Sequence, residues 1–268
     1  MSRLIVTIAP PTPNGDLHLG HIAGPYMAAD VYARVQRQKG HDVLFVSYSD
    51  DYQSYLQRKG RELGIEPFAL GLRNGAMIHE TLGMLDIRPD WWMQSGHNPH
   101  FRDAVRMFYE GAAARGAIGT RMHRMAYFPA FDVWGYEAYA RGACNHCGTS
   151  SDASQCEHCA HAPDINRMDG LSCTLGASPL EWREVERDYL KVGMYREFLR
   201  DLYGRHPLRP NLRAFVDEVL ALPDEDLEWY TTRPHECGVT IPTSGGDRVV
   251  HTWFSGIAGY YAASREYM

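Results

Sequence analysis

The first fifty residues contain two short apolar runs that are separated by a turn and an amphipathic segment. The runs cover residues 3–9 (RLIVTIA) and 42–51 (DVLFVSYSDD), and each suits a buried strand better than a helix. Between them, residues 21–38 carry apolar side chains at helical spacing, and Gly40 supplies a helix stop. A strand, a helix and a second strand in this order form a βαβ unit. The pattern therefore predicts a parallel sheet that binds its ligand at the carboxyl ends of the strands.

The composition permits one large domain, or one domain that carries an insertion. The chain has 268 residues, of which 44% are hydrophobic and 22% are charged, which is ordinary for a soluble protein. A net charge of −6 gives no overall basic surface, so a nucleic-acid partner would need a local basic patch. No apolar run approaches the roughly 18 residues of a membrane span, and the N-terminus lacks a signal-peptide pattern. We therefore expect a cytoplasmic protein without a membrane partner.

The rest of the chain changes character twice. Residues 66–82 and 98–115 return to helical spacing, and the tryptophan-rich piece between them predicts another strand. Residues 116–168 combine crowded aromatic side chains with cysteines, and we expect an inserted lobe of hairpins that a metal holds together, because such a segment has little apolar volume of its own. Three helical stretches are expected in residues 180–222. Residues 248–268 predict a strand followed by a helix.

Four of the six cysteines form two CxxC pairs, namely Cys144, Cys147, Cys156 and Cys159. In a cytosolic chain this spacing favours zinc over disulfides or a redox role, because each CxxC turn presents two thiolates to one tetrahedral ion. Four thiolates leave no position for water, so the expected zinc is structural and not catalytic. Cys173 and Cys237 lack such spacing and are expected to be buried small residues or idle thiols.

The turn after the first apolar run reads PPTPNGDLHLGH, and together with the cysteine pairs it resembles the class I aminoacyl-tRNA synthetases. The position of the cysteines and a late Trp followed by Gly-Tyr look most like the methionyl branch. The resemblance implies a Rossmann-like (HUP-type) α/β fold with a parallel sheet and an inserted zinc-knuckle lobe. It places the first half of the nucleotide-binding fold in residues 1–115, the zinc-binding insertion in 116–170, and a helical segment with re-entry into the second half in 171–268.

Two histidines three residues apart at a helix start suit a triphosphate, because imidazoles on the first turn can hydrogen-bond phosphate oxygens as pyrophosphate leaves. The resemblance implies that His18 and His21 are catalytic, and that Gly20 lets the adenine end approach the backbone. The alternative for two such histidines is helix capping or a surface position. The ATP-binding set implied by the resemblance is Pro11, Asn14, Gly15, His18, Gly20 and His21.

Asp50 ends the second apolar run and matches the family's acidic residue that receives the α-ammonium of the amino acid. Its alternative role is a helix N-cap. Trp253 and Tyr260 match the aromatic walls of the family's methionine pocket, although either residue also suits a core. Arg233 matches a family arginine, with a functional and a structural role equally weighted. The implied amino-acid-binding set is Ala9, Pro10, Thr12, Asp50, Trp253, Gly256 and Tyr260.

Several positions depart from the family pattern. Thr12 stands where an aromatic residue is usual, Tyr52 replaces a histidine, Gln53 replaces a glycine, and Gly256-Ile257 replaces an Ala-Pro pair. These positions line or back the amino-acid pocket in the family. Whether the amino acid is methionine or an analogue therefore stays open.

The chain has no KMSKS-like loop and no helical anticodon-binding domain, so we expect a piece of a longer protein or a chain that a partner completes. The leading expectation is an enzyme that uses ATP, with Mg²⁺, to form an aminoacyl-adenylate and then transfers the amino acid to tRNA. One alternative is transfer to a small-molecule acceptor in biosynthesis. Another is a zinc-containing binding module whose catalytic site has decayed.

Overall fold

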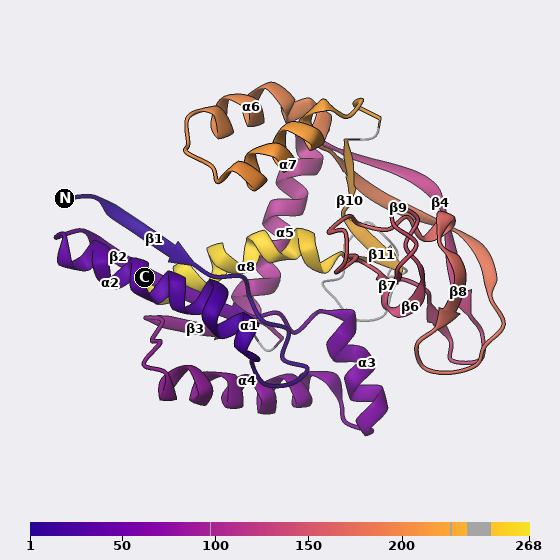
Figure 1. The fold of residues 1–268 in the computed structure, drawn as a ribbon, viewed down its shortest axis with the longest axis horizontal. Helices are drawn as coiled ribbons and strands as arrows, with labels where there is room; N and C mark the ends of the chain where they lie inside the picture. Colours follow the sequence, from indigo (N-terminus) through magenta and orange to yellow (C-terminus); the bar gives the residue numbers. More distant parts are fainter. Residues whose placement is uncertain (97, 226, 235–247) are drawn as a thin grey trace.

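The computed structural model describes residues 1–96, 98–225, 227–234 and 248–268. A parallel sheet with its helices lies at one end of the molecule, and an antiparallel lobe lies at the other (Figure 1). The last helix runs between them. Cys237 lies outside the described residues.

The parallel sheet consists of β1 (Arg3–Thr7), β2 (Asp42–Ser49) and β3 (Trp91–Gln94), in the order β1-β2-β3. Both pairings are parallel, with Thr7 opposite Val46 and Ser49 opposite Gln94. The carboxyl ends of the three strands therefore meet at one edge. The predicted βαβ unit and the predicted tryptophan-rich strand are confirmed.

The helical segment between β1 and β2 contains a wide turn. It runs as α1 (Leu19–His21), a π-helical stretch (Ile22–Tyr26) and α2 (Met27–Gln38), and it ends before Gly40, which has a φ of +80°. Pro25 lies inside the π-helical stretch, where the altered hydrogen bonding accommodates a residue that has no backbone N–H. The turn buries Tyr26, whose hydroxyl donates to the carbonyl of Ala9 at 3.2 Å.

Three helices follow the first strands: α3 (Ser54–Leu63), α4 (Pro67–Met84) and α5 (Pro99–Ala114). The predicted helices over 66–82 and 98–115 are thereby confirmed. Glu66 caps α4 by accepting from the Ala69 N–H, and Asn98 caps α5 by accepting from the Phe101 N–H. A proline follows each cap at the position where a missing N–H costs nothing.

The inserted lobe is built from antiparallel sheets. One has the order β10-β9-β4-β5 and the other the order β7-β6-β8. Its strands are β4 (Ile118–Phe128), β5 (Val133–Trp134), β6 (Glu137–Ala143), β7 (Ser150–Ala153), β8 (Asp169–Cys173), β9 (Glu181–Lys191) and β10 (Glu228–Tyr230), with a 3₁₀ turn at Ile165–Arg167. Cys173 is buried, as expected. This lobe of hairpins agrees with the prediction for residues 116–168.

The prediction of three helical stretches in residues 180–222 is wrong for the first of them. Residues Glu181–Lys191 form β9, which pairs with β4 from Ile118 opposite Leu190 to Tyr127 opposite Glu181. Its charged residues suit an exposed helix by propensity, but cross-strand contacts prevail: the Arg183 guanidinium lies 3.4 Å from the ring centroid of Tyr127. One sheet therefore contains strands from both sides of residue 170. The division of the chain at residues 115 and 170 stays a prediction.

The other two helical stretches are α6 (Arg196–Gly204) and α7 (Pro210–Ala221), after a 3₁₀ turn at Val192–Tyr195. The chain then forms the antiparallel pair β11 (Thr232–Pro234) and β12 (Arg248–Val250), and it ends with α8 (Thr252–Tyr267). The predicted strand and helix in 248–268 are confirmed. Alanines of α8 pack into the core cluster that contains residues of β2 and α5. Among the described helices, none has both the length and the apolar content that crossing a bilayer requires.

A buried carboxylate joins the lobe to the rest of the molecule. Asp188 of β9 is 3% exposed and accepts hydrogen bonds from Tyr109 of α5 at 2.7 Å, Thr120 of β4 at 2.7 Å and Arg248 of β12 at 2.9 Å. Its backbone N–H donates to Thr232 of β11 at 2.7 Å. The carboxylate of Asp188 therefore joins α5, β4 and β12, and its backbone joins β11.

Replacing Asp188 by Asn should destabilise the folded chain, because a hydrogen bond to a charged group contributes about 1.5–3 kcal/mol and Arg248 loses its buried counter-charge. We expect the urea midpoint, followed by circular dichroism, to fall clearly. The control is Asp217→Asn on α7, where the carboxylate is exposed and lies 4.0 Å from Arg213. Equal midpoints for the two variants would contradict the assignment.

Candidate functional site

The proline-rich turn after β1 is fixed against the carboxyl end of the parallel sheet. The Pro11 carbonyl accepts the backbone N–H of Asp50 at 2.9 Å, which ties the turn to the end of β2. On the other side, the buried side chain of Asn74 in α4 donates to the carbonyl of Pro13 at 2.8 Å. The turn is therefore held from both sides at the edge where α/β sheets bind ligands.

A pocket of about 400 Å³ opens along this turn and the helix that follows it. Its lining residues are Ala9, Pro10, Pro11, Thr12, Asn14, Asp16, His18, His21, Pro25, Tyr26 and Tyr55. Four residues of the predicted ATP-binding set and three of the predicted amino-acid set are thus brought to one cavity. Gly15 and Gly20 lie in the same stretch of chain without lining the cavity.

His18 and His21 form a stacked pair at the start of α1. Their ring centroids are 3.8 Å apart, and the ring planes are inclined by 21°. The Nδ1 of His18 accepts from the N–H groups of Gly20 and His21 at 3.1 and 3.4 Å, and the Nδ1 of His21 accepts from the His18 N–H at 3.4 Å. Each neutral ring therefore carries its proton on Nε2. Burial, and then the neighbouring His18, lower the pKa of His21, which favours this neutral form.

The glycine between the histidines has a steric reason in the structure. A Cβ atom at Gly20 would lie 3.0 Å from Cε1 and 3.1 Å from Nδ1 of His18. Any larger residue would press on the ring that caps the helix. The predicted reason, access for adenine, concerns a ligand and stays a prediction.

Asp50 lies just beyond β2 and is 4% exposed. Its carboxylate accepts from Gln53 Nε2 at 2.6 Å and from Thr252 Oγ1 at 2.9 Å. Burial raises the pKa of Asp50 to about 6; these two hydrogen bonds oppose the rise, neighbouring Asp51 adds to it, and Arg233 also opposes it. The surrounding donors therefore stabilise the ionised carboxylate less than water would.

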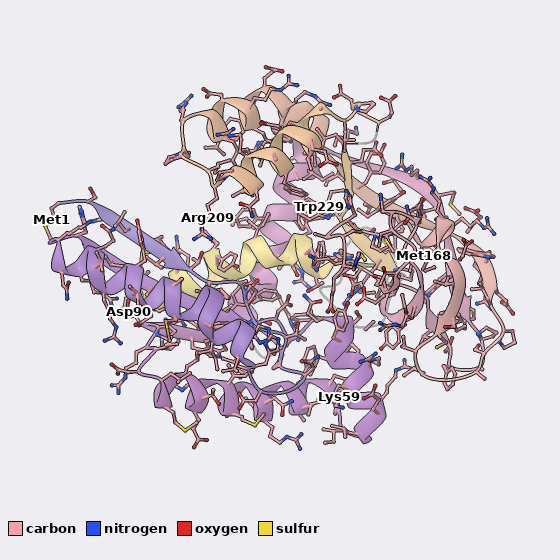
Figure 2. All side chains as sticks on the ribbon, viewed as in Figure 1. Met1, Lys59, Asp90, Met168, Arg209 and Trp229 are labelled. Carbon is pink, nitrogen blue, oxygen red and sulfur yellow. The ribbon has the colours of Figure 1, made fainter. Side chains whose placement is uncertain are left out.

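The remaining amino-acid candidates lie on α8. The ring of Tyr260 meets Tyr48 of β2 edge to face at 5.4 Å, and the Tyr48 hydroxyl donates to the Gly256 carbonyl at 2.8 Å. Burial, and then Asp50, raise the pKa of Tyr260, which places this side chain within electrostatic reach of the carboxylate. Trp253 is 39% exposed and meets Trp229 of β10 edge to face at 6.5 Å. Figure 2 labels Trp229, near the middle of the molecule. Of these residues Tyr260 lies nearest in effect to Asp50, and none of them lines the pocket of the proline-rich turn.

Tyr26 connects the two groups of residues. It lines the pocket and its hydroxyl contacts Ala9, while burial, and then Tyr260, raise its pKa. In the sequence Tyr26 falls among the apolar side chains of the predicted helix over 21–38. Tyr55, which the sequence pattern does not single out, lines the pocket and donates to Asp152 of β7 at 2.6 Å. The available signal for Tyr55 was its position in the first turn of a helix that follows a strand's carboxyl end.

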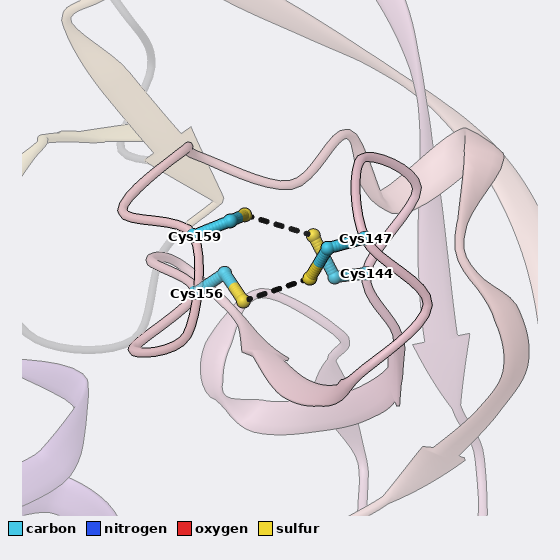
Figure 3. A group of neighbouring side chains, drawn as sticks. All are labelled: Cys144, Cys147, Cys156 and Cys159. Atoms are coloured by element: carbon cyan, nitrogen blue, oxygen red, sulfur yellow. Dashed lines mark hydrogen bonds between the residues drawn. The ribbon is translucent and has the colours of Figure 1, made fainter.

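The four clustered cysteines face one another in two tight turns of the lobe (Figure 3). All four sulfur atoms lie within 4.8 Å of one another, with Sγ–Sγ distances of 3.8 Å for Cys144–Cys159 and 3.7 Å for Cys147–Cys156. Zinc–sulfur bonds of about 2.3 Å in a tetrahedron place the sulfurs about 3.8 Å apart, so the residues fit such an ion.

The two cysteine turns share one backbone pattern. The N–H of Cys144 donates to Thr149 O and the N–H of Gly148 to Cys144 O. The second turn repeats these bonds from Cys156 to His161 O and from Ala160 to Cys156 O. Gly148 and Ala160 both have positive φ, at +74° and +63°. The repeated geometry indicates two matching half-sites for one ion.

Comparisons with known proteins agree with this architecture. A methionine–tRNA ligase of Pyrobaculum aerophilum is 28% identical over 271 residues, which cover 100% of this chain and 47% of the relative. A methionine–tRNA ligase of Salinispora arenicola is 31% identical over 275 residues, with 100% and 45% coverage. The chain therefore spans about half the length of the curated relatives that it matches.

The fold has a counterpart among solved structures. Mycobacterium tuberculosis methionyl-tRNA synthetase in complex with methionyl-adenylate superimposes with a TM-score of 0.72 at 20% identity, covering 98% of this chain and 47% of that one. The predicted Rossmann-like fold with an inserted cysteine-bearing lobe is thereby confirmed. The family model described as tRNA synthetases class I (M) matches residues 4–268. Since that match takes in nearly the whole chain, the protein belongs to the class I tRNA synthetases of this type.

Proposed function

We propose that this chain is catalytic machinery of a methionyl-tRNA synthetase, which activates methionine with ATP and transfers it to tRNA. The observation that carries the proposal is the pocket along the proline-rich turn. There the Nε2 atoms of His18 and His21 have no hydrogen-bond partner among the described residues, and Asp50 is bonded to the same turn. In the activation step a carboxylate oxygen of the amino acid attacks the α-phosphorus of ATP. The new bond forms as the bond from the α-phosphorus to the bridging oxygen breaks and pyrophosphate leaves.

The histidine pair acts on the phosphates of ATP, which enters as its Mg²⁺ complex. Both Nδ1 atoms are occupied by backbone N–H groups, so the Nε2–H groups remain as donors to phosphate oxygens. Charge grows on these oxygens as pyrophosphate departs, and fixed donors stabilise it without reorganisation. No enzyme nucleophile is needed, because the histidines position and stabilise the reacting groups.

The buried carboxylate of Asp50 serves the amino acid. Its raised pKa reflects a charge that Gln53 and Thr252 compensate only in part, and an α-ammonium group supplies the missing positive charge. This pairing leaves the substrate carboxylate free to attack. Tyr260 and Gly256 both contact Tyr48 and are the proposed contacts of the side chain, with Trp253 at the exposed start of α8.

The acceptor favoured here is tRNA, because the relatives are named as methionine–tRNA ligases. The same names favour methionine over an analogue. A decayed binding module is disfavoured by the intact geometry of the histidine pair and Asp50. Zinc, held by the four cysteines, is the proposed structural ion of the lobe, and the cytoplasm is the proposed compartment because clustered thiolates suit a reducing environment.

The proposal is tested by amino-acid-dependent exchange of pyrophosphate into ATP, measured with the full-length protein. Exchange that depends on methionine, followed by charging of tRNA, is expected. If no amino acid supports exchange, the proposal is overturned. Exchange without charging, but with transfer to a small acceptor, would replace tRNA by that acceptor.

Replacing Gly20 by Ala should displace the His18 ring, because the added Cβ lies 3.0 Å from it. Loss of one well-placed donor costs about 100-fold or more in kcat, so we expect an exchange rate reduced by about that factor with little change in stability. The control is Gly24→Ala in the same helical segment, where a Cβ meets nothing within 4 Å. Equal exchange rates for the two variants would show that the His18 ring does not depend on the absence of a side chain at position 20.

The exchange rate at low methionine should fall as the pH drops below about 6, because protonation of Asp50 removes the charge that receives the ammonium. Asp50→Asn should abolish this dependence and lower kcat/KM by about 10-fold to 100-fold, the loss of a charged hydrogen bond. The raised pKa means that ionised Asp50 costs folding free energy above that pKa, so the Asn variant should not lose stability at neutral pH. A variant that keeps the wild-type pH profile would contradict this role.

Replacing Cys156 by Ser should lower the zinc content of purified protein and destabilise the lobe, because the ion loses one of four thiolates. The matched control is Cys173→Ser, a buried cysteine outside the cluster. Metal analysis by mass spectrometry separates the variants. Undiminished zinc in the Cys156 variant would show that these cysteines do not form the site.

A further inference from the structure

The carboxylate of Glu137 lies between the first turns of two helices that belong to the core of the molecule. Glu137 begins β6 of the inserted lobe and is 5% exposed. Its Oε2 accepts from the hydroxyl of Ser54, the first residue of α3, at 2.5 Å. Its Oε1 lies 2.7 Å from Nε2 of His251, the N-cap of α8. A residue of the lobe thus contacts the start of both helices.

The His251 ring is fixed through both nitrogens. Its Nδ1 accepts the backbone N–H of Trp253 at 3.2 Å, so the proton of the neutral ring is on Nε2, the atom that lies 2.7 Å from Glu137 Oε1. Burial lowers the pKa of His251 against the opposing effect of Glu137. Burial alone would raise the pKa of Glu137, but His251, Arg233 and Ser54 together lower it to about 2. The Glu137 carboxylate is therefore ionised, and the bond to Nδ1 fixes the orientation of the ring beside it.

Both helix starts lead directly to Asp50. Gln53 precedes Ser54 and donates to the Asp50 carboxylate at 2.6 Å. Thr252 follows His251 and donates to the same carboxylate at 2.9 Å. The two donors that hold Asp50 are thus chain neighbours of the two residues that hold Glu137.

The lobe adopts an unfavourable backbone conformation to present this side chain. Glu137 has a φ of +44°, which is costly for a residue with a Cβ, and the pairing of β6 with β7 shifts register between Glu137 and Arg141. Such irregularities aim side chains at functional sites. Buried Arg233 completes the arrangement, with Nη1 3.5 Å from Glu137 and Nη2 donating to the Tyr52 carbonyl at 2.5 Å.

We infer that Glu137 is a positioning residue for the amino-acid site, which orients Asp50 through Ser54–Gln53 on one side and His251–Thr252 on the other. The inference rests on the proposed function only for what Asp50 binds. The inserted lobe thereby contributes to amino-acid binding without contacting the substrate. Asp50 would be held less firmly if either connection were broken.

The test compares Glu137→Ala, Glu137→Gln and His251→Asn in the full-length protein, with exposed Glu184→Gln of β9 as the control. Glu137→Ala should raise KM for methionine by about 10-fold to 100-fold, the effect of a small misplacement, and leave KM for ATP within about twofold. Glu137→Gln keeps the shape and an acceptor for His251, and should recover most of the loss. Asparagine at position 251 still caps α8 but is too short to reach Glu137. His251→Asn should therefore raise KM for methionine as Glu137→Ala does, and it provides the test if Glu137→Ala folds poorly.

A second readout does not depend on activity. Carboxyl ¹³C NMR of the aspartates should show the pKa of Asp50 rising in Glu137→Ala and His251→Asn, because weaker bonds from Gln53 and Thr252 lower it less. An unchanged Asp50 pKa would overturn the inference, as would variants that lose kcat only in proportion to their folded fraction. Wild-type protein without exchange would refute the proposed function, while the NMR result would still decide the positioning role.

Discussion

The structure depends on keeping the carboxylate of Asp50 in a place that water hardly reaches. Burying an ionised carboxylate costs several kcal/mol unless donors replace its hydration. Here Gln53 and Thr252 replace part of it, and a pKa of about 6 shows that the compensation is incomplete. In the proposed function a bound ammonium group completes it. The proposed site would thus gain binding free energy from a charge that the fold alone does not satisfy.

The donors of Asp50 come from parts of the chain that are far apart in sequence. Gln53 follows the first βαβ unit, whereas Thr252 begins the last helix, which comes after the lobe and after α6 and α7 (Figure 1). The proposed amino-acid side of the site therefore cannot form until the chain has returned from the lobe. Asp188 and Glu137 are two buried residues of the lobe that contact the core, and the cysteine cluster brings together two turns of the same lobe.

Local patterns predicted a large part of this molecule. The βαβ unit, the helices over 66–82 and 98–115 and the cysteine cluster all follow from spacing along the chain, and the histidine string identified the turn that lines the pocket. The strand at Glu181–Lys191 was wrongly predicted as a helix, because its charged residues take their conformation from pairing with β4. Tyr55, Glu137 and His251 were missed for a related reason. Their partners are fixed by tertiary contacts, and no short motif reports such contacts.

The most direct measurement of the central claim is a crystal structure of the full-length protein with a non-hydrolysable analogue of methionyl-adenylate. The account predicts the α-ammonium group on the carboxylate of Asp50, the methionine side chain beside Tyr260, and the phosphate mimic facing the Nε2 atoms of His18 and His21. An ammonium group that points to solvent, or a phosphate mimic that lies away from the histidine pair, would contradict it.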